Sequence, residues 1–278
     1  MDISALNILA TEITEDRTKT VGERIQAVLA LRTQLASESE DLKYRFEAAC
    51  FSKLLGMVKA SNENHEYDIE LFQLYTLLAE SYEHLQDFRR MKPLAEEVLR
   101  LMEECDVSYQ VIELSVPRII DALKSSVYNH DRYRLLSAFL HAACDAASDD
   151  DCYSEEVVKE RMRQMLNLRG LLDPATRPDI LDADLMIFIS YHIPPEEFGG
   201  IMDNPKETLL KKDPVEYTLR WEEVYYDVTD ELDRKFAGTP RGMGFCIMYW
   251  PAMADLLRKK YGIEWRSPSL MNPRVMFD

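Results

Sequence analysis

Glycine and proline are scarce in this sequence, at 9 and 12 of 278 residues. Sandwiches and barrels made only of β-strands need many tight turns, and these two residues supply most of them. Their scarcity argues against such folds, while the 46% hydrophobic content is sufficient for a core. We therefore predict an all-α protein, long enough for one elongated domain or two compact ones.

Basic residues are also few, with 33 Lys and Arg against 50 Asp and Glu and a formal net charge of −17. Nucleic acids and anionic membranes are bound through a basic footprint, so we expect neither as a partner. The sequence lacks the apolar run of about 18 residues that spans a bilayer, and its start does not resemble a secretory signal. Five scattered cysteines without a C-x-x-C pair indicate reduced thiols and a cytoplasmic protein.

Known catalytic and phosphate-binding motifs are missing, including G-x-x-x-x-G-K-[ST], H-E-x-x-H and G-x-S-x-G. His141 and Asp145 stand four positions apart, close to the acidic run 149–151 and Cys152, and this combination could hold a metal ion. The same run is typical of a solvated loop that leads into a helix, which is the interpretation we favour. We accordingly predict no metal site, no cofactor and no catalytic residue.

Helical patterns fill the first part of the chain. Thr20 and Glu23 have the spacing of a capping box, which predicts a helix over residues 21–36. We expect another helix over residues 41–59 and one over residues 155–168. Apolar stripes at helical spacing predict a helical hairpin over residues 74–101, with its turn at Gln86-Asp87.

That hairpin resembles a tetratricopeptide repeat. The family's aromatic, leucine, small-residue, turn and apolar-pair positions are matched by Tyr75, Leu78, Ala79, Tyr82, Gln86-Asp87-Phe88 and Val98-Leu99. The chain departs from the family at the turn glycine, which is Gln86, at Met91, and in lacking the closing proline. A second copy runs from Ile119 to Ala143, with a turn at His130-Asp131. The resemblance implies a right-handed superhelix of stacked antiparallel hairpins that binds a peptide or protein.

The pattern changes after Leu168, which predicts three parts: a helical hairpin array at 1–168, a loop-rich joint at 169–212, and a C-terminal helical cap with an irregular tail at 213–278. In the joint we expect one short buried helix near residues 180–191. The last part should hold helices over residues 213–236 and 245–261 and no helix beyond Ser267-Pro268. It could be a separate domain or the cap that closes the array.

The stretch GTPRGMGFCIMYWP, residues 238–251, is the candidate site. Gly242 and Gly244 could let backbone N–H groups approach an anion at a helix N-terminus, with Arg241 as a further donor. Alternatively, the glycines only form the turn between two helices. The remaining candidates for such a ligand site are Tyr249, Trp265 and Arg266.

Charge is unevenly distributed along the chain. Residues 234–278 hold eight basic and three acidic residues, a balance of +5, which leaves −22 for residues 1–233. The prediction is a protein-interaction or scaffold module whose acidic helical surface binds a basic protein or peptide. In a variant of this idea, the basic C-terminal segment docks onto the acidic array of the same chain or of a second copy in a homodimer. The alternative is a small-molecule binder or enzyme with an anionic ligand between the array and the C-terminal helices.

Overall fold

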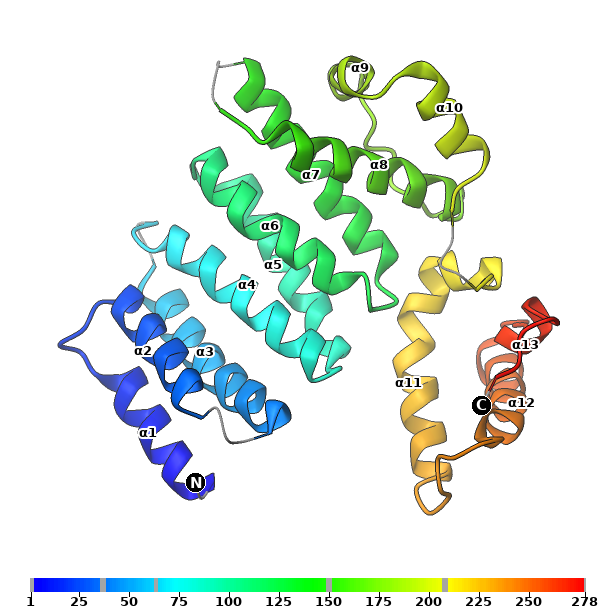
Figure 1. Ribbon diagram of the computed structural model, residues 1–278, viewed down its shortest axis with the longest axis horizontal. Coiled ribbons are helices and arrows are strands. Elements are labelled where there is room, and N and C mark those ends of the chain that lie inside the picture. The colour runs from blue at the N-terminus through cyan, green and yellow to red at the C-terminus, as the bar shows by residue number, and fades with distance from the viewer. Residues whose placement is uncertain (1–2, 36–38, 63–64, 149–151, 207–209, 278) are drawn as a thin grey trace. The chain divides into compact units, whose positions relative to one another are not determined.

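The computed structural model describes residues 3–35, 39–62, 65–148, 152–206 and 210–277. Across these residues the chain forms thirteen α-helices that pack in sequential order, and no β-strand (Figure 1). The predicted all-α class is confirmed. No helix in the described ranges combines the length and the apolar character that crossing a membrane requires.

The chain divides into two compact units. Unit 1 comprises Met1–Ser126 and Arg134–Arg161, and unit 2 comprises Val127–Tyr133 and Met162–Asp278. The predicted three-part division at residues 168 and 212 stays a prediction.

Unit 1 is built from helices joined by short connections. Their bounds are α1 Ile3–Glu15, α2 Val21–Gln34, α3 Glu40–Ser61, α4 Asp68–His84, the 3-10 turn η1 Phe88–Arg90, α5 Met91–Glu104 and α6 Tyr109–Leu123. Helices α7 (Asn129–Ser148) and α8 (Glu155–Leu171) contribute residues to both units. Helix α4 packs against α3, α5 and α6, so its apolar residues lie at the centre of the unit.

Local capping explains where these helices begin. The predicted box at α2 is present, because Thr20 Oγ1 accepts from Glu23 N at 3.2 Å while Glu23 Oε2 accepts from Thr20 N at 2.8 Å. Ser39 caps α3 by accepting from Leu42 N. Helices α2, α3 and α8 therefore confirm the predicted ones, apart from small differences at their ends.

The predicted hairpin is confirmed as α4, η1 and α5. At its turn, Asp87 N donates to Tyr82 O and Gln86 N donates to Glu83 O, which is the Schellman pairing at a helix C-terminus. Gln86 has a φ of 54°, the left-handed conformation that glycine normally provides here. The side chain at this position departs from the repeat pattern, but the backbone has the geometry of a glycine turn.

In the second copy, the predicted turn at His130-Asp131 is wrong. Helix α7 begins at Asn129, so both residues lie in its first turn, and both are buried. A polar pair suggested a turn, but the backbone N–H and the ring of His130 form hydrogen bonds within unit 2.

Unit 2 contains the remaining elements: α9 Ala183–His192, α10 Pro195–Asp203, the 3-10 turn η2 Pro214–Tyr217, α11 Leu219–Lys235, α12 Phe245–Leu256, a π-helical turn η3 Leu257–Tyr261, and α13 Pro268–Met271. A core cluster of this unit joins α11 to α12 and the segment that follows. The cluster consists of Trp221, Val224, Val228, Leu232, Met253, Leu257, Ile263 and Trp265.

Several expectations for this part need correction. The joint holds a second helix, α10, and α13 lies beyond Ser267, because in both places proline occupies the first helical position and starts a helix rather than stopping one. Helix α9 is buried on one face only, with Tyr191 exposed. The helix expected over residues 213–236 is divided into η2 and α11, capped by Asp213 and Thr218 respectively. The helix predicted over residues 245–261 is present as α12 and η3, and it ends at Gly262 as predicted, where φ is 69°.

Candidate functional site

The turn before α12 contains the two candidate glycines. Gly244 has a φ of 83° and is the N-cap of α12, so this position requires a left-handed conformation. Phe245 N donates to Gly242 O at 3.0 Å, and Ile247 N donates to Gly244 O at 3.1 Å. These two N–H groups of the first turn are therefore already bonded within the turn.

Arg241 pairs with an acid of its own hairpin. Its Nη2 lies 2.7 Å from Asp233 Oδ1 on α11, and its guanidinium carbon lies 5.7 Å from the centre of the Phe245 ring. Both charged groups are exposed, so the pair is weak and open to solvent.

Tyr249 belongs to an aromatic cluster with Phe236 and Phe245, at ring-centre distances of 6.0 and 5.4 Å. Burial, helped by the charge of Asp233, raises the pKa of Tyr249 to about 12. The phenol therefore stays protonated at neutral pH and contributes to packing.

Trp265 and Arg266 form a second group, with two acids near the start of α11. The indole Nε1–H of Trp265 donates to Glu216 Oε1 at 2.8 Å, and its ring stacks on Trp221. Arg266 donates its backbone N–H and its Nε–H to Asp213 Oδ2, at 2.9 and 2.7 Å. The candidate residues thus lie in two groups, one around Arg241 and Tyr249 and one around Trp265 and Arg266. Each group contacts carboxylates or aromatic rings of unit 2.

Burial affects these two acids differently. Burial raises the pKa of Glu216 in spite of its bond from Trp265. Burial also opposes the charge on Asp213, but the hydrogen bonds from Arg266 and from Val215 N prevail and lower its pKa. Asp213 is thus a fixed negative charge that holds the segment after α12 against η2.

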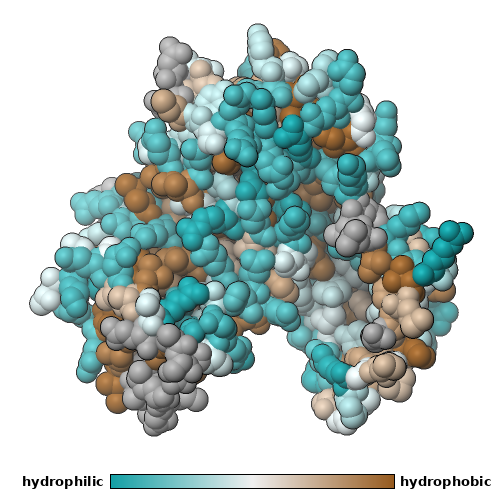
Figure 2. All heavy atoms as spheres, in the orientation of Figure 1, coloured by the Kyte–Doolittle hydropathy of each residue, from teal (hydrophilic) through white to brown (hydrophobic). Residues whose placement is uncertain are grey.

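The outer side of α12 is apolar and exposed. Of its twelve residues only Asp255 is charged, and only Met253 is buried. Ile247 is 73% exposed, and Met243 and Met276 are each 91% exposed. Figure 2 shows apolar side chains at the surface over the C-terminal helices that Figure 1 labels α12 and α13.

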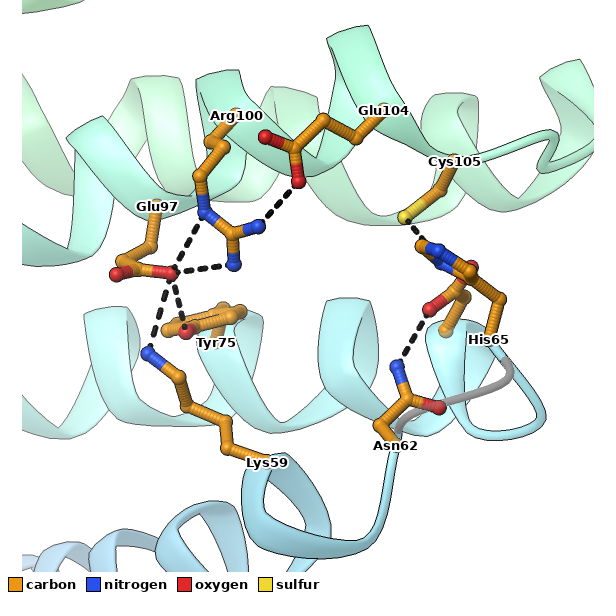
Figure 3. A network of polar contacts seen from close by, with 9 residues as sticks. Lys59, Asn62, His65, Tyr75, Glu97, Arg100, Glu104 and Cys105 are labelled. Atoms are coloured by element: carbon orange, nitrogen blue, oxygen red, sulfur yellow. Dashed lines mark hydrogen bonds and ion pairs between the residues drawn. The ribbon is translucent and has the colours of Figure 1, made fainter.

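A separate polar cluster lies where α4 begins and α5 ends (Figure 3). His65 Nδ1 lies 3.5 Å from Cys105 Sγ and 3.1 Å from Asp68 Oδ2. Asn62 Nδ2 donates to the other carboxylate oxygen, Asp68 Oδ1, at 2.7 Å, and Asn62 Oδ1 accepts from Tyr67 N. The ligand atoms of His65, Asp68 and Cys105 all lie within 4.8 Å of one another.

Next to this cluster, Glu97 Oε2 contacts donor groups of three residues. Lys59 Nζ lies at 3.1 Å, Arg100 Nη2 at 2.9 Å, and the Tyr75 hydroxyl donates at 3.5 Å. Arg100 also pairs with Glu104 (Figure 3). Burial opposes the charge on Glu97, but the bonds from Arg100 and Lys59 lower its pKa. This network ties α3, α4 and α5 together beside the cluster.

Sequence reasoning missed the cluster of His65, Asp68 and Cys105. The only signal was the predicted hairpin, since an antiparallel pair places the end of α5 beside the start of α4. The pair considered instead, His141 and Asp145, is not gathered in this way: His141 Nδ1 bonds to Ser137 O at 2.9 Å. The acidic run 149–151 lies outside the described residues.

Comparisons of this chain with protein-family models, with curated proteins and with solved structures find no match.

Proposed function

We propose that this chain is a protein-interaction module, and the observation that carries the proposal is the exposed apolar side of α12. A helix that is apolar on all sides is typically buried on all sides. Helix α12 packs one side on α11 and leaves Ile247 and Met248 exposed at its surface. Exposed apolar patches on proteins commonly mark binding sites, and methionine adapts well to different partners.

The charge distribution supports a partner that combines apolar and charged surface. The apolar part of α12 is followed by Arg258, Lys259 and Lys260, whereas the rest of the chain is strongly acidic. In this proposal the acidic helices of unit 1 bind a basic protein or peptide, and the exposed side of α12, in unit 2, is an apolar contact surface of its own. A second copy of the chain has both features and is one such partner. Burial of apolar area would supply most of the free energy, and charge would supply orientation.

We also infer that the helices of unit 1 form a right-handed, tetratricopeptide-like superhelix. Packing of α4 against both α5 and α6 supports this, because stacked hairpins place each helix against its neighbour and its next-but-one neighbour. A crystal structure would test the handedness directly.

The alternative, an anionic-ligand site, has less support. Arg241 and Arg266 are each paired with a carboxylate, and Trp265 is buried. A thermal-shift screen with anionic metabolites tests it, and stabilisation that is lost in Arg241→Ala would favour this alternative over ours.

Substitution on α12 tests the interaction proposal. The full chain, its Ile247→Asp/Met248→Asp variant and a Leu114→Asp control are used to capture partners from native cell extract, and the self-association of each is measured by sedimentation. Leu114 is a matched control because it is 72% exposed but lies on α6. We expect the α12 variant to lose at least about tenfold in affinity, or about 1.4 kcal/mol, and the control to bind like wild type. Equal binding by both variants, or no binding by wild type, would contradict the proposal.

A further inference from the structure

We propose that His65, Asp68 and Cys105 form a zinc site with three protein ligands and a fourth position open to solvent. This inference is independent of the interaction proposal and rests on unit 1 alone.

The separations between the ligand atoms fit a tetrahedral ion. Zinc binds sulfur at about 2.3 Å and nitrogen or oxygen at about 2.0–2.2 Å, so tetrahedral angles put N and S about 3.6 Å apart and N and O about 3.4 Å apart. The observed distances from His65 Nδ1 are 3.5 Å to Cys105 Sγ and 3.1 Å to Asp68 Oδ2. The Cys105 sulfur and the Asp68 carboxylate also lie within 4.8 Å of each other, so all three ligand atoms surround one position.

The pattern of contacts differs from that of a catalytic cysteine. In a triad, one ring nitrogen of histidine faces the nucleophile and the other faces the acid. Here the same atom, His65 Nδ1, faces both the thiol and the carboxylate. Three donors that converge on one point are what a metal ion requires.

Neighbouring groups orient the ligands. Asn62 occupies Asp68 Oδ1 and is itself fixed by Tyr67 N, which leaves Oδ2 directed at the cluster. Such outer hydrogen bonds typically hold metal ligands in place. His65 has a φ of 59°, an uncommon conformation for a residue with a side chain.

The surroundings also favour a cation. Cys105 caps the C-terminus of α5, where the helix dipole is negative, and follows Glu103 and Glu104 in the sequence. His65 is more than half exposed, whereas Asp68 is buried, so an ion can enter from the side of the imidazole. The donor set of nitrogen, sulfur and oxygen suits zinc, while magnesium and calcium prefer oxygen alone.

Metal titration of the full chain, first stripped with a chelator, tests the site. Zinc affinity is measured by competition with a chromophoric chelator, and Co²⁺ serves as the spectroscopic probe. We expect one ion per chain, a thiolate-to-cobalt charge-transfer band, and a rise in the melting temperature with zinc. Asn62→Ala should weaken zinc binding by about 10- to 100-fold, and Cys105→Ser should remove the charge-transfer band.

Two further variants distinguish the loss of a metal ligand from the loss of the folded structure. His65→Gly removes the imidazole at a backbone conformation that glycine adopts readily, so it should keep the fold and lose zinc binding. Cys152→Ser changes an exposed thiol outside the cluster and should leave affinity and spectrum unchanged. The proposal is overturned if wild type binds no zinc in a one-to-one ratio. It is equally overturned if His65→Gly and Cys105→Ser, folded by circular dichroism, bind zinc as wild type does.

Discussion

Oε1 of Glu222 accepts two hydrogen bonds from His130, from its backbone N–H at 3.0 Å and from its ring Nδ1 at 2.7 Å. The other ring nitrogen lies 3.1 Å from the Thr176 hydroxyl. Both His130 and Glu222 are buried, and both belong to unit 2. One carboxylate thus connects α11 to the first turn of α7, at positions 92 residues apart.

Removal of this carboxylate should destabilise unit 2. Glu222→Ala leaves two buried donors of His130 without their acceptor, and we expect a loss of about 3 kcal/mol in the free energy of unfolding. Glu223→Ala is the matched control, since its exposed pair with Arg220 contributes little. All three tryptophans lie in unit 2, so urea unfolding followed by tryptophan fluorescence reports this unit. Equal stability of the two variants would contradict this role of Glu222 in holding unit 2 together.

Glu47 should reduce the stability of unit 1 at neutral pH. It is buried, Arg32 Nη1 is 3.5 Å away, and within the described residues its Oε1 has no hydrogen-bond donor. Burial raises the pKa of Glu47 above its unfolded value, which is about 4.3. Ionisation therefore disfavours the folded state at neutral pH, and this penalty fades as pH falls through the folded pKa towards the unfolded one.

We accordingly expect Glu47→Gln to be more stable than wild type by about 1 kcal/mol at pH 7. The difference should shrink as the pH is lowered towards about 4.5. Glu40→Gln, at an exposed carboxylate whose pKa is lowered by Lys43, should show no such gain. Urea unfolding, followed by circular dichroism at several pH values, compares the stabilities of the two variants with that of wild type. If Glu47→Gln stabilises the chain equally at all pH values, the buried charge is not the cause.

Asp213 should have the opposite pH dependence. Its lowered pKa means that its contribution to stability is present above the unfolded value, about 3.9, and is lost as pH falls through the folded pKa. Asp213→Asn should cost about 2 kcal/mol at pH 7, because the charged bonds to Arg266 are replaced by neutral ones. The gap between variant and wild type should narrow below about pH 4. Tryptophan fluorescence is a direct readout, since Trp265 is adjacent to Arg266, and a gap that stays constant with pH would refute the role of the charge.

Substitution of Gln86 by glycine should cost less stability than substitution by a β-branched residue. At a φ of 54° a valine side chain is strained, so Gln86→Val should cost about 1 kcal/mol or more. Gln86→Gly relieves the backbone while adding flexibility to the unfolded chain, and the two effects should nearly cancel. Thermal unfolding compares the stability of the two variants. A glycine variant less stable than the valine variant would show that the turn is not left-handed in solution.

Helices in this chain could largely be predicted from local signals. The capping box of Thr20 and Glu23 and the stop at Gly262 act within one turn of helix, so the sequence around them was sufficient. Helices α10 and α13 were not predicted, because proline was taken to end helices. Pro195 and Pro268 stand at first helical positions, where the backbone N–H has no partner within the helix in any case.

Contacts between distant positions were beyond prediction from one sequence. His130 gives no local sign of Glu222, and the cluster of Cys105 with His65 depends on the α4–α5 hairpin bringing residues 40 positions apart together. The candidate site at residues 238–251 was located by its composition. Its one cation, Arg241, however, pairs with Asp233 on the preceding helix, and composition does not identify this partner.

Site-specific photo-cross-linking tests the central claim, that α12 binds a partner, most directly. A benzoylphenylalanine is placed at position 247 on α12 or at position 114 on α6, and the full chain is irradiated in native extract. We expect position 247 to give a discrete adduct, of twice the chain's mass if the partner is a second copy, and position 114 to give none. Adducts of equal yield from both positions, or none from position 247, would contradict the account.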